Sequence, residues 1–496
     1  MLKDVKKDYK KLQNIAKQQI DEKKYLSCLN TISCMANIAY HLNFKFYDDE
    51  LEIFLEKISI KTIGALNMTP IKGRWVFYDY FGFDNKGLTQ QYLNALEDLG
   101  VEFLYILENY INDSKHKDII DQVNRNKNAT IYINDSKVSI KKQIVNISKK
   151  IYEYKPEKSL LHLAPWSCLS IILWIRFSKI ERYFINLTDH AFWLGKNTFD
   201  YCIEFRQYGT YFSSNYRKIN KNKLLMSHYY PIINQTNFMG LPDEVGSRVK
   251  IFSGGTYFKV YGSNNLYFKI VKRILLKHDN TVLLFAGSGD DKPFREFIKK
   301  NKFQNRIFLL GYRADINEII KKSNIYLGTC PMGGGLMGQY ALLNNIPTIA
   351  YVDKNLPTYF IETILYKEGI KCSYTDLNTF YNRFDYIMKN YKNMSINTGL
   401  VSPSREQFLE NFKLLIGNNK PQYEIKDFNF NKYKFEELYF DIENNYLKQY
   451  DLIKFKWLGV KYFKYDPYAA FLSFINIMIN NKQILWMKIM QKLKAI

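Results

Sequence analysis

The chain has little cysteine and no cysteine pattern. Its six cysteines, at positions 28, 34, 168, 202, 330 and 372, form no CxxC pair and follow no regular spacing. Disulfide-stabilised secreted scaffolds and zinc ribbons depend on such spacings, so both classes are excluded. The sequence predicts reduced and mostly buried thiols, as in a cytosolic protein.

Long apolar runs and a secretory signal are also lacking. The longest apolar stretches, residues 167–177 and 468–480, are shorter than the roughly 20 helical residues that cross a bilayer. The N-terminus, MLKDVKKDYKK, is charged and has no apolar core of the kind that signal peptides contain. We therefore expect a cytoplasmic protein, either soluble or peripheral at the inner face of a membrane.

Two common nucleotide-binding signatures are missing. No GxxxxGK[ST] motif occurs, which excludes a P-loop NTPase, and residues 286–291 (AGSGDD) supply only the first half of a GxGxxG fingerprint. The second absence argues against a dinucleotide-dependent oxidoreductase. What the chain does have is a formal charge of +23, most of it from lysine. This charge favours anionic partners such as nucleotide phosphates, nucleic acid or an acidic membrane, although a lysine-rich coding bias explains part of it.

The order of apolar patterns predicts the fold class. Residues 74–81, 88–100 and 101–107 read as strand, amphipathic helix and strand, the unit of a doubly wound parallel sheet. After a Pro- and Gly-rich stretch the alternation resumes, with helices expected at 257–276 and 357–367. At 496 residues, the chain is therefore predicted to be an α/β protein with two Rossmann-like domains. The expected parts are a helical N-terminal extension (1–66), a first domain (67–240), a second domain (241–424) and a helical tail (425–496).

Glycines gather where the strands of the second half are expected to end. Gly333, Gly334, Gly335 and Gly338 stand between a strand and a helix in IYLGTCPMGGGLMGQY. Glycine at such a place lets backbone N–H groups approach an anion at the N-terminus of the helix. The alternative is a tight turn that packs well. Further glycine loops follow earlier strands at 254–255, 287–289 and 311.

Glycine loops in this order resemble the donor domain of GT-B glycosyltransferases, over roughly residues 70–420. The resemblance implies two Rossmann-like domains facing each other across a cleft, with a nucleotide sugar bound mainly on the second. The donor contacts that it implies are Gly254, Gly255, Lys259, Gly287, Ser288, Gly289, Tyr312, Arg313, Gly333, Gly334, Gly335, Leu336, Met337, Gly338 and Gln339. Lys259 would place a positive charge at the phosphates, and Tyr312 and Arg313 would line the base pocket.

A second segment, FINLTDHAFWLG at 184–195, resembles inverting transferases that have a histidine in the first domain. Bacterial protein N-glucosyltransferases and O-linked N-acetylglucosamine transferases are of this kind. His190 is then the candidate general base or sugar-hydroxyl ligand, and Asp189 either orients it or caps the next helix. The alternative is a structural histidine. His162, at another strand end, is a weaker candidate.

Other strand ends of the first half are expected to face the diphosphate and the acceptor. The residues concerned are Gly82, Asp84, Lys86 and Gly87 in one loop, and Glu204 and Arg206 after a later strand. The E-x7-E pair of many retaining enzymes is absent, and Tyr340 occupies the place of their acidic residue, beside Gln339. This departure inclines the prediction towards inversion. No DxD motif of the metal-dependent GT-A transferases occurs either, so no metal and no cofactor are expected.

The predicted function is transfer of a sugar from a nucleotide sugar, UDP-sugar being favoured, to a glycan, a lipid-linked molecule or a protein. The alternative is a non-catalytic nucleotide- or nucleic-acid-binding protein with a Rossmann-like core. A nucleic-acid partner is not expected, because only the charge supports one. Lysines and aromatic residues alternate at 454–464 (KFKWLGVKYFK). They predict either an amphipathic helix on an anionic membrane surface or a C-terminal helix that packs back on the first domain.

Overall fold

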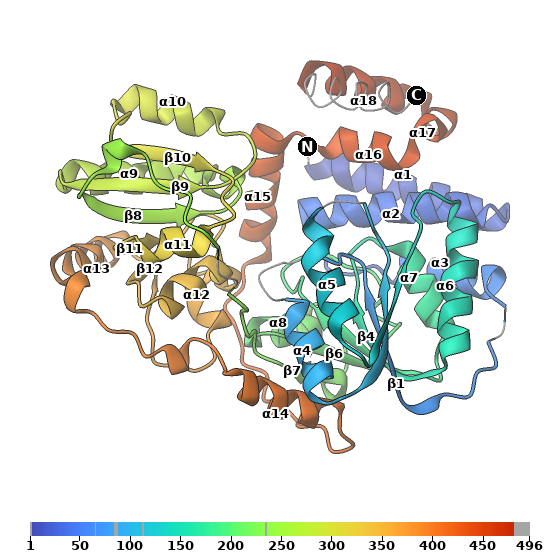
Figure 1. Cartoon of the computed structure of the whole chain (residues 1–496). Coiled ribbons are helices and arrows are strands. Elements are labelled where there is room, and N and C mark those ends of the chain that lie inside the picture. The colour runs from blue at the N-terminus through green and yellow to red at the C-terminus, as the bar shows by residue number, and fades with distance from the viewer. Residues whose placement is uncertain (1, 65, 84–87, 112–113, 234–235, 481–496) are drawn as a thin grey trace.

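The computed structural model describes residues 2–64, 66–83, 88–111, 114–233 and 236–480. They form two α/β units side by side, and helices from both ends of the chain lie together on the first unit (Figure 1). The predicted α/β class with two Rossmann-like domains is confirmed. All six cysteines are buried, free thiols, as expected from their spacing.

A seven-stranded sheet forms the centre of the first unit, with its strands parallel in the order β3-β2-β1-β4-β5-β6-β7. The strands are β1 (Ile71–Asp79), β2 (Glu102–Leu107), β3 (Ala129–Ile133), β4 (Pro156–His162), β5 (Glu181–Asn186), β6 (Tyr201–Glu204) and β7 (Leu224–Met226). The central strand β1 is buried from Trp75 to Asp79, because helices cover both faces of the sheet.

Alternate residues of β1 pack against the two helical layers. Phe77 belongs to the core that contains Tyr92 of α4, whereas the ring of Tyr78 packs edge-on against Trp174 of α7 on the other face. The helices of this unit are α4 (Gln90–Asp98), α5 (Lys117–Arg125), α6 (Ile140–Tyr154), α7 (Cys168–Arg176) and α8 (Gln207–Asn215).

The second unit repeats the topology with a six-stranded parallel sheet in the order β10-β9-β8-β11-β12-β13. Its strands are β8 (Val249–Gly254), β9 (Thr281–Ala286), β10 (Ile307–Gly311), β11 (Ile325–Leu327), β12 (Thr348–Tyr351) and β13 (Ser373–Tyr374). Its helices are α9 (Leu266–Lys277), α10 (Lys292–Asn301), α11 (Ile316–Lys321), α12 (Gly335–Leu343) and α13 (Leu377–Asn390). In both sheets the chain order reverses beside the first strand of the unit, the place where doubly wound proteins bind ligands.

Two predicted helices of the second unit are wrong. The helix expected at 257–276 begins only at Leu266, after a 3₁₀ turn (Tyr257–Val260), because residues 262–265 all have positive φ and cannot continue a right-handed helix. The helix expected at 357–367 is replaced by two 3₁₀ turns, Pro357–Tyr359 and Ile361–Ile364.

The helices at the two ends of the chain pack on the first unit or on one another. They are α1 (Leu2–Asp21), α2 (Tyr25–Leu42) and α3 (Asp49–Thr62) at the start, and α14 (Arg405–Ile416), α15 (Lys432–Ile442), α16 (Tyr450–Leu458), α17 (Val460–Tyr465) and α18 (Pro467–Asn480) at the end. Although α14 falls within the range 241–424, its Phe412 packs on Trp75 and Tyr92 of the first unit.

The first part of the C-terminal tail packs on the N-terminal helices. Helix α16 lies along α2, and Lys454 is buried there with its Nζ 2.8 Å from Asp8 Oδ2. Lys454 is therefore not part of an exposed basic face, and the packing alternative describes α16 correctly. Over the described part of the chain, no helix is both long and apolar enough to cross a bilayer.

Candidate functional site

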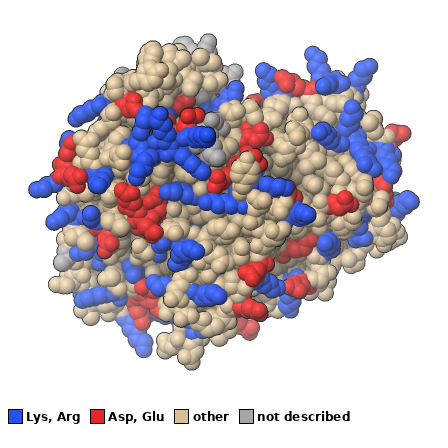
Figure 2. Space-filling model, turned by 180° about the vertical axis from the view of Figure 1, so that it is seen from behind, with Lys and Arg blue, Asp and Glu red and all other residues tan. Residues whose placement is uncertain are grey.

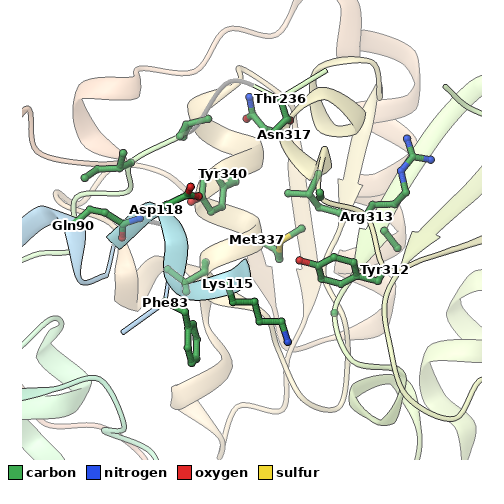
Figure 3. A pocket seen from close by; sticks show the side chains of 18 of the residues that line it. Phe83, Gln90, Lys115, Asp118, Thr236, Tyr312, Arg313, Asn317, Met337 and Tyr340 are labelled. Atoms are coloured by element: carbon green, nitrogen blue, oxygen red, sulfur yellow. The ribbon is translucent and has the colours of Figure 1, made fainter. Parts of the chain in front are cut away.

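A cleft of about 1510 Å³ separates the two units, and we call it the large cleft. One wall consists of residues of α4, α5 and the segments before them. The other consists of loops that follow β8, β9, β10 and β11. Figure 3 shows Lys115 and Asp118 on one side and Tyr312 and Arg313 on the other. The cleft thus lies at the carboxyl ends of the strands of the second sheet, where ligands of this topology bind.

Most of the predicted donor residues line this cleft together. They are Gly254, Gly255, Lys259, Gly287, Ser288, Tyr312, Arg313, Gly333, Gly334, Gly335, Leu336 and Met337. Gly289, Gly338 and Gln339 do not line it. Gln339 is buried and its amide donates to the carbonyl oxygen of Val401 at 3.0 Å, so its side chain is committed to the protein.

The glycines of the 333–338 loop fall into two groups. A Cβ at Gly333 would lie 2.7 Å from the carbonyl oxygen of Tyr359, and one at Gly338 would lie 2.8 Å from Ile361 Cδ1. Protein packing alone therefore requires these two glycines. At Gly334 and Gly335 a Cβ would meet nothing closer than 3.7 Å, and neither has a positive φ. Their missing side chains leave bare backbone facing the cleft where α12 begins, an arrangement suited to a phosphate.

Lys259 supplies the positive charge next to this loop. It stands on the 3₁₀ turn after β8, and its carbonyl accepts a hydrogen bond of 3.2 Å from the backbone N–H of Met332. Among the described residues its half-buried ammonium makes no ion pair and no side-chain hydrogen bond. Burial lowers the pKa of Lys259, because the charged form loses solvation. An anion in the cleft would restore that stabilisation.

Tyr312 and Arg313 differ in how they are held. The Arg313 guanidinium donates to Asp315 at 2.7 and 2.6 Å and to the carbonyl of Gly240 at 2.8 Å, which ties this loop to the linker. The Tyr312 ring is 80% exposed and stands in the cleft. An exposed aromatic face at this position can stack on a base.

A smaller hollow of about 410 Å³ adjoins the large cleft, and we call it the aromatic pocket. The two share Lys259, Gly333, Gly335 and Leu336, so the glycine loop and Lys259 stand where the two hollows meet. Its ring-bearing lining residues are Tyr40, His41, His190, Phe205, Tyr229, Phe258, Tyr359 and Tyr439. His190 is the predicted catalytic residue, and it reaches this pocket from the first unit with 35% of its side chain exposed.

The loop that carries His190 is held by buried donors. Asn43 Nδ2, just after α2, donates to the carbonyl of His190 at 2.9 Å. The buried guanidinium of Arg217 donates to the carbonyls of Asp189 and Ala191 at 2.8 and 2.6 Å. Because these carbonyls are fixed, the imidazole is presented from a preorganised backbone, as catalytic groups require.

Asp189 is committed to Arg206. The guanidinium donates to both carboxylate oxygens, at 2.5 and 2.8 Å, whereas His190 Nδ1 is 3.5 Å from Asp189 Oδ1. Burial works to raise the pKa of Asp189, but the Arg206 charge and hydrogen bonds outweigh it, and the net pKa is lowered. Arg206 also donates to Thr358 and Thr363 of the second unit. It lines the aromatic pocket but is not free to bind an acceptor.

The remaining candidates line neither hollow or lie outside the described residues. Glu204 is fully buried, accepts hydrogen bonds from Asn186 and Ser213, and its burial raises its pKa. His162 is buried against Asp79, at 2.9 Å. The carbonyl of Gly82 accepts from His116 Nδ1 at 2.8 Å. Asp84, Lys86 and Gly87 lie outside the described residues.

Sequence reasoning missed the contribution of the N-terminal helices. Tyr40 and His41, at the end of α2, line the aromatic pocket, and burial together with the Lys456 charge lowers the pKa of His41 to about 4. His41 is therefore a neutral imidazole at physiological pH. Sequence reasoning also missed the wall of the large cleft that α5 and the 3₁₀ turn before it form, with Lys115 on the turn and Asp118 and Asp121 on the helix. No short-range pattern marks either group, because both come to the site through long-range packing.

Known proteins resemble this chain in structure, with low scores, but not in sequence. No family model matches the chain, and no curated protein matches it. An O-GlcNAc transferase of Thermobaculum terrenum superposes with a TM-score of 0.47 at 11% identity, over 84% of this chain and 78% of that one.

Two further solved structures give similar values. Anabaena HepE in complex with UDP and glucose has a TM-score of 0.45 at 12% identity, over 68% of this chain and 94% of that one. A glycosyltransferase of Rickettsia africae has a TM-score of 0.44 at 14% identity, over 78% and 99%. All three scores lie below 0.5, so the function has to be inferred from this chain's own site.

Proposed function

We propose that the chain is a glycosyltransferase that moves a sugar from a nucleotide sugar, UDP-sugar favoured, to an acceptor hydroxyl or amide. The observation that carries this proposal is the pair Gly334 and Gly335. Packing does not require glycine at either position, and both expose backbone at the start of α12 beside Lys259. Backbone N–H groups, a helix N-terminus and a cation together stabilise a diphosphate.

In this proposal the two hollows bind different parts of the substrates. The nucleoside occupies the large cleft near Tyr312, and the diphosphate lies at the junction that both hollows share. The sugar then points towards the aromatic pocket and His190. The acceptor oxygen or nitrogen attacks the anomeric carbon as its bond to the diphosphate breaks, and the nucleotide leaves with the bonding electrons. His190 Nε2 or Nδ1 takes the acceptor proton.

Attack from the side of the first unit, opposite the leaving diphosphate, favours inversion at the anomeric carbon. The acceptor is a glycan, a lipid-linked molecule or a protein. The site of action in this proposal is the cytoplasm, with the enzyme peripheral to the inner face of the membrane. The absence of a DxD motif from the sequence predicts activity that survives EDTA.

Calorimetry with UDP and GDP tests the phosphate site. Gly334→Val and Gly335→Val should abolish nucleotide binding and leave the circular dichroism spectrum unchanged, since the space for a Cβ is free of protein atoms within 3.7 Å. Gly64→Val is the matched control, because a Cβ there has free space too, with no atom within 4 Å. Unchanged affinity in the two folded loop variants would contradict the assignment.

A donor screen then separates a transferase from a nucleotide-binding protein. Release of the nucleotide from UDP-, GDP- and CMP-sugars is measured with each variant. Turnover that needs His190 supports transfer. Nucleotide binding without turnover of any sugar donor would favour the non-catalytic alternative.

A further inference from the structure

Helix α18 exposes more apolar surface than its neighbours in the tail. Seven of its side chains are each 38% to 73% exposed: Tyr468, Phe471, Leu472, Phe474, Ile475, Met478 and Ile479. Its buried residues are Ala470, Ser473 and Ile477. The helix contains no charged residue. Contiguous apolar surface of this kind marks a site of interaction with a protein or a membrane.

A lysine-lined hollow adjoins the end of α18. It measures about 820 Å³ and is lined by residues of α9, α10 and the segment before α16, together with Asn480, the last residue of α18. Five lysines line it, against the two carboxylates Asp290 and Glu296: Lys269, Lys272, Lys292, Lys300 and Lys448. The first four are exposed and form no ion pair with the described residues.

The two features lie along one edge of the molecule. In Figure 1, α10 and α18 both stand at the upper edge, above the two units. In Figure 2, which is turned by 180°, α18 lies at the upper left. The surface at this edge is largely uncharged, whereas basic and acidic residues are interspersed below it. Exposed Lys461 and Lys464 precede α18, and residues 481–496 contribute four further lysines and no acidic residue to the sequence.

We propose that the α18 edge is a docking surface for an anionic lipid bilayer, with the apolar side chains of α18 in the interface and the lysine hollow against lipid phosphates. The positive charge of the chain favours a membrane over a second copy of the chain as the occupant of this surface. A second copy of this chain would bring a second set of lysines and a net charge of +23 against the first. An anionic membrane attracts both the hollow and the lysines beside α18.

This surface would account for the peripheral location proposed above, and its membrane binding does not depend on nucleotide binding. The bilayer contact is made by α18 and by lysines of α9 and α10, whereas the large cleft is lined by other residues. A lipid-linked acceptor would then be held near an enzyme in which no helix of the described residues is both long and apolar enough to cross a bilayer.

Vesicle flotation tests the proposal with the full chain. The probes are vesicles of phosphatidylcholine alone and of phosphatidylcholine mixed with phosphatidylglycerol, each at low and high salt. We expect binding to the mixed vesicles that weakens with salt, and little binding to the neutral ones. No binding to the mixed vesicles, or equal binding to both, would overturn the proposal.

Variants with matched controls test whether the membrane contact is made by α18 and the lysine-lined hollow. Lys269→Gln with Lys272→Gln should weaken binding by about fivefold per lysine removed. Lys141→Gln with Lys142→Gln, on exposed residues of α6, should change it far less. Phe471→Ser with Ile479→Ser should weaken binding by more than about tenfold, because two large apolar groups are lost. The control is Leu414→Ser, at a side chain of α14 that is 58% exposed.

Nucleotide affinity and oligomeric state distinguish the membrane contact from the donor site and from self-association. UDP affinity should be the same in all these variants, so loss of nucleotide binding bears on the proposed function alone. Gel filtration without lipid should show monomers throughout. A wild-type dimer that Phe471→Ser converts to monomers would assign the α18 edge to a second copy and overturn the membrane proposal.

Discussion

The carboxylate of Asp189 is held by the guanidinium of Arg206 in a buried pair, with hydrogen bonds of 2.5 and 2.8 Å. Because this partner keeps Asp189 ionised and occupied, Asp189 is not the proton acceptor of the site. His190, at the next position, lines the aromatic pocket with 35% of its side chain exposed. The pair also joins the units, since the same guanidinium donates to the Thr358 carbonyl at 2.9 Å.

Asp189→Asn should destabilise the protein by about 3–5 kcal/mol, because it leaves the Arg206 charge buried without its counter-ion. Urea unfolding measures the loss. Glu153→Gln is the matched control. It breaks the Lys149–Glu153 pair of α6, in which the lysine and glutamate side chains are 70% and 52% exposed, and should cost no more than about 1 kcal/mol. Equal losses in the two variants would contradict the assignment of Asp189 as a buried anchor.

The same pair predicts how stability depends on acid. The pKa of Asp189 is lowered in the folded protein, so the pair contributes stability at pH values above the unfolded pKa of about 3.9. That contribution is lost as the pH falls from about 4 through the folded pKa. Asp189→Asn should therefore show a flatter decline below pH 4 than the wild type, as measured by urea midpoints across this range. Parallel curves would exclude Asp189 as a source of the acid sensitivity.

His190→Ala should lower turnover of the nucleotide sugar by at least about a hundredfold while UDP affinity changes little, since a general base contributes about 10²–10⁴ in rate. Nucleotide release and calorimetry measure the two quantities. His278→Ala, at a histidine that pairs with Asp385 on the second unit, is the control and should retain its turnover. Near-normal turnover of His190→Ala would make this histidine structural.

Lys259→Met should weaken UDP binding by roughly 10- to 100-fold, the loss expected for one hydrogen bond to a charged group. The same change should leave thermal stability equal or raised, because it removes a half-buried ammonium without a partner among the described residues. Calorimetry and thermal unfolding of one sample report both effects. A fall in stability together with unchanged affinity would show that the lysine has a packing role alone.

Thr358→Val with Thr363→Val should loosen the contact between the units while leaving the Asp189–Arg206 pair in place. The two hydroxyls accept from Arg206 at 3.2 and 2.9 Å, and the variants remove both acceptors. Hydrogen exchange should rise at residues 187–191 and 357–364. Thr348→Val, which removes a local hydroxyl of the second unit, is the control. Unchanged exchange in the double variant would show that the backbone carbonyl of Thr358 suffices.

Local patterns predict the parts of this fold that depend on neighbours in sequence. Residues Trp75–Tyr78 form a continuous apolar run, and such a run is typical of a strand that is covered on both faces, as this one is. The glycine loops follow the strands they were predicted to follow. The predicted helix at 257–276 fails for a local reason too, since Ser263, Asn264 and Asn265 follow Gly262 in the left-handed region and the apolar period does not report backbone φ.

Other parts of the site depend on contacts between distant residues. Asn43 bonds the carbonyl of His190 across 147 positions, and Arg206 reaches Thr358 across 152. Nothing in the local sequence at residues 40–43 distinguishes this segment from the end of any other apolar helix. The anchoring role of Arg206, in place of the predicted acceptor role, likewise becomes visible only when the second unit is placed beside the first.

The return of α14 to the first unit makes the second unit an insertion. The chain leaves after β7 at Met226, and the carbonyl of that residue accepts from Asn411 of α14 at 3.1 Å and from Tyr423 at 3.3 Å. Exit and re-entry are therefore adjacent. Two covalent connections at one place form a hinge. The second unit can tilt towards or away from the first, but it cannot rotate freely as it could about a single linker. Replacement of residues 230–403 by a short loop would leave every strand of the first sheet in the chain.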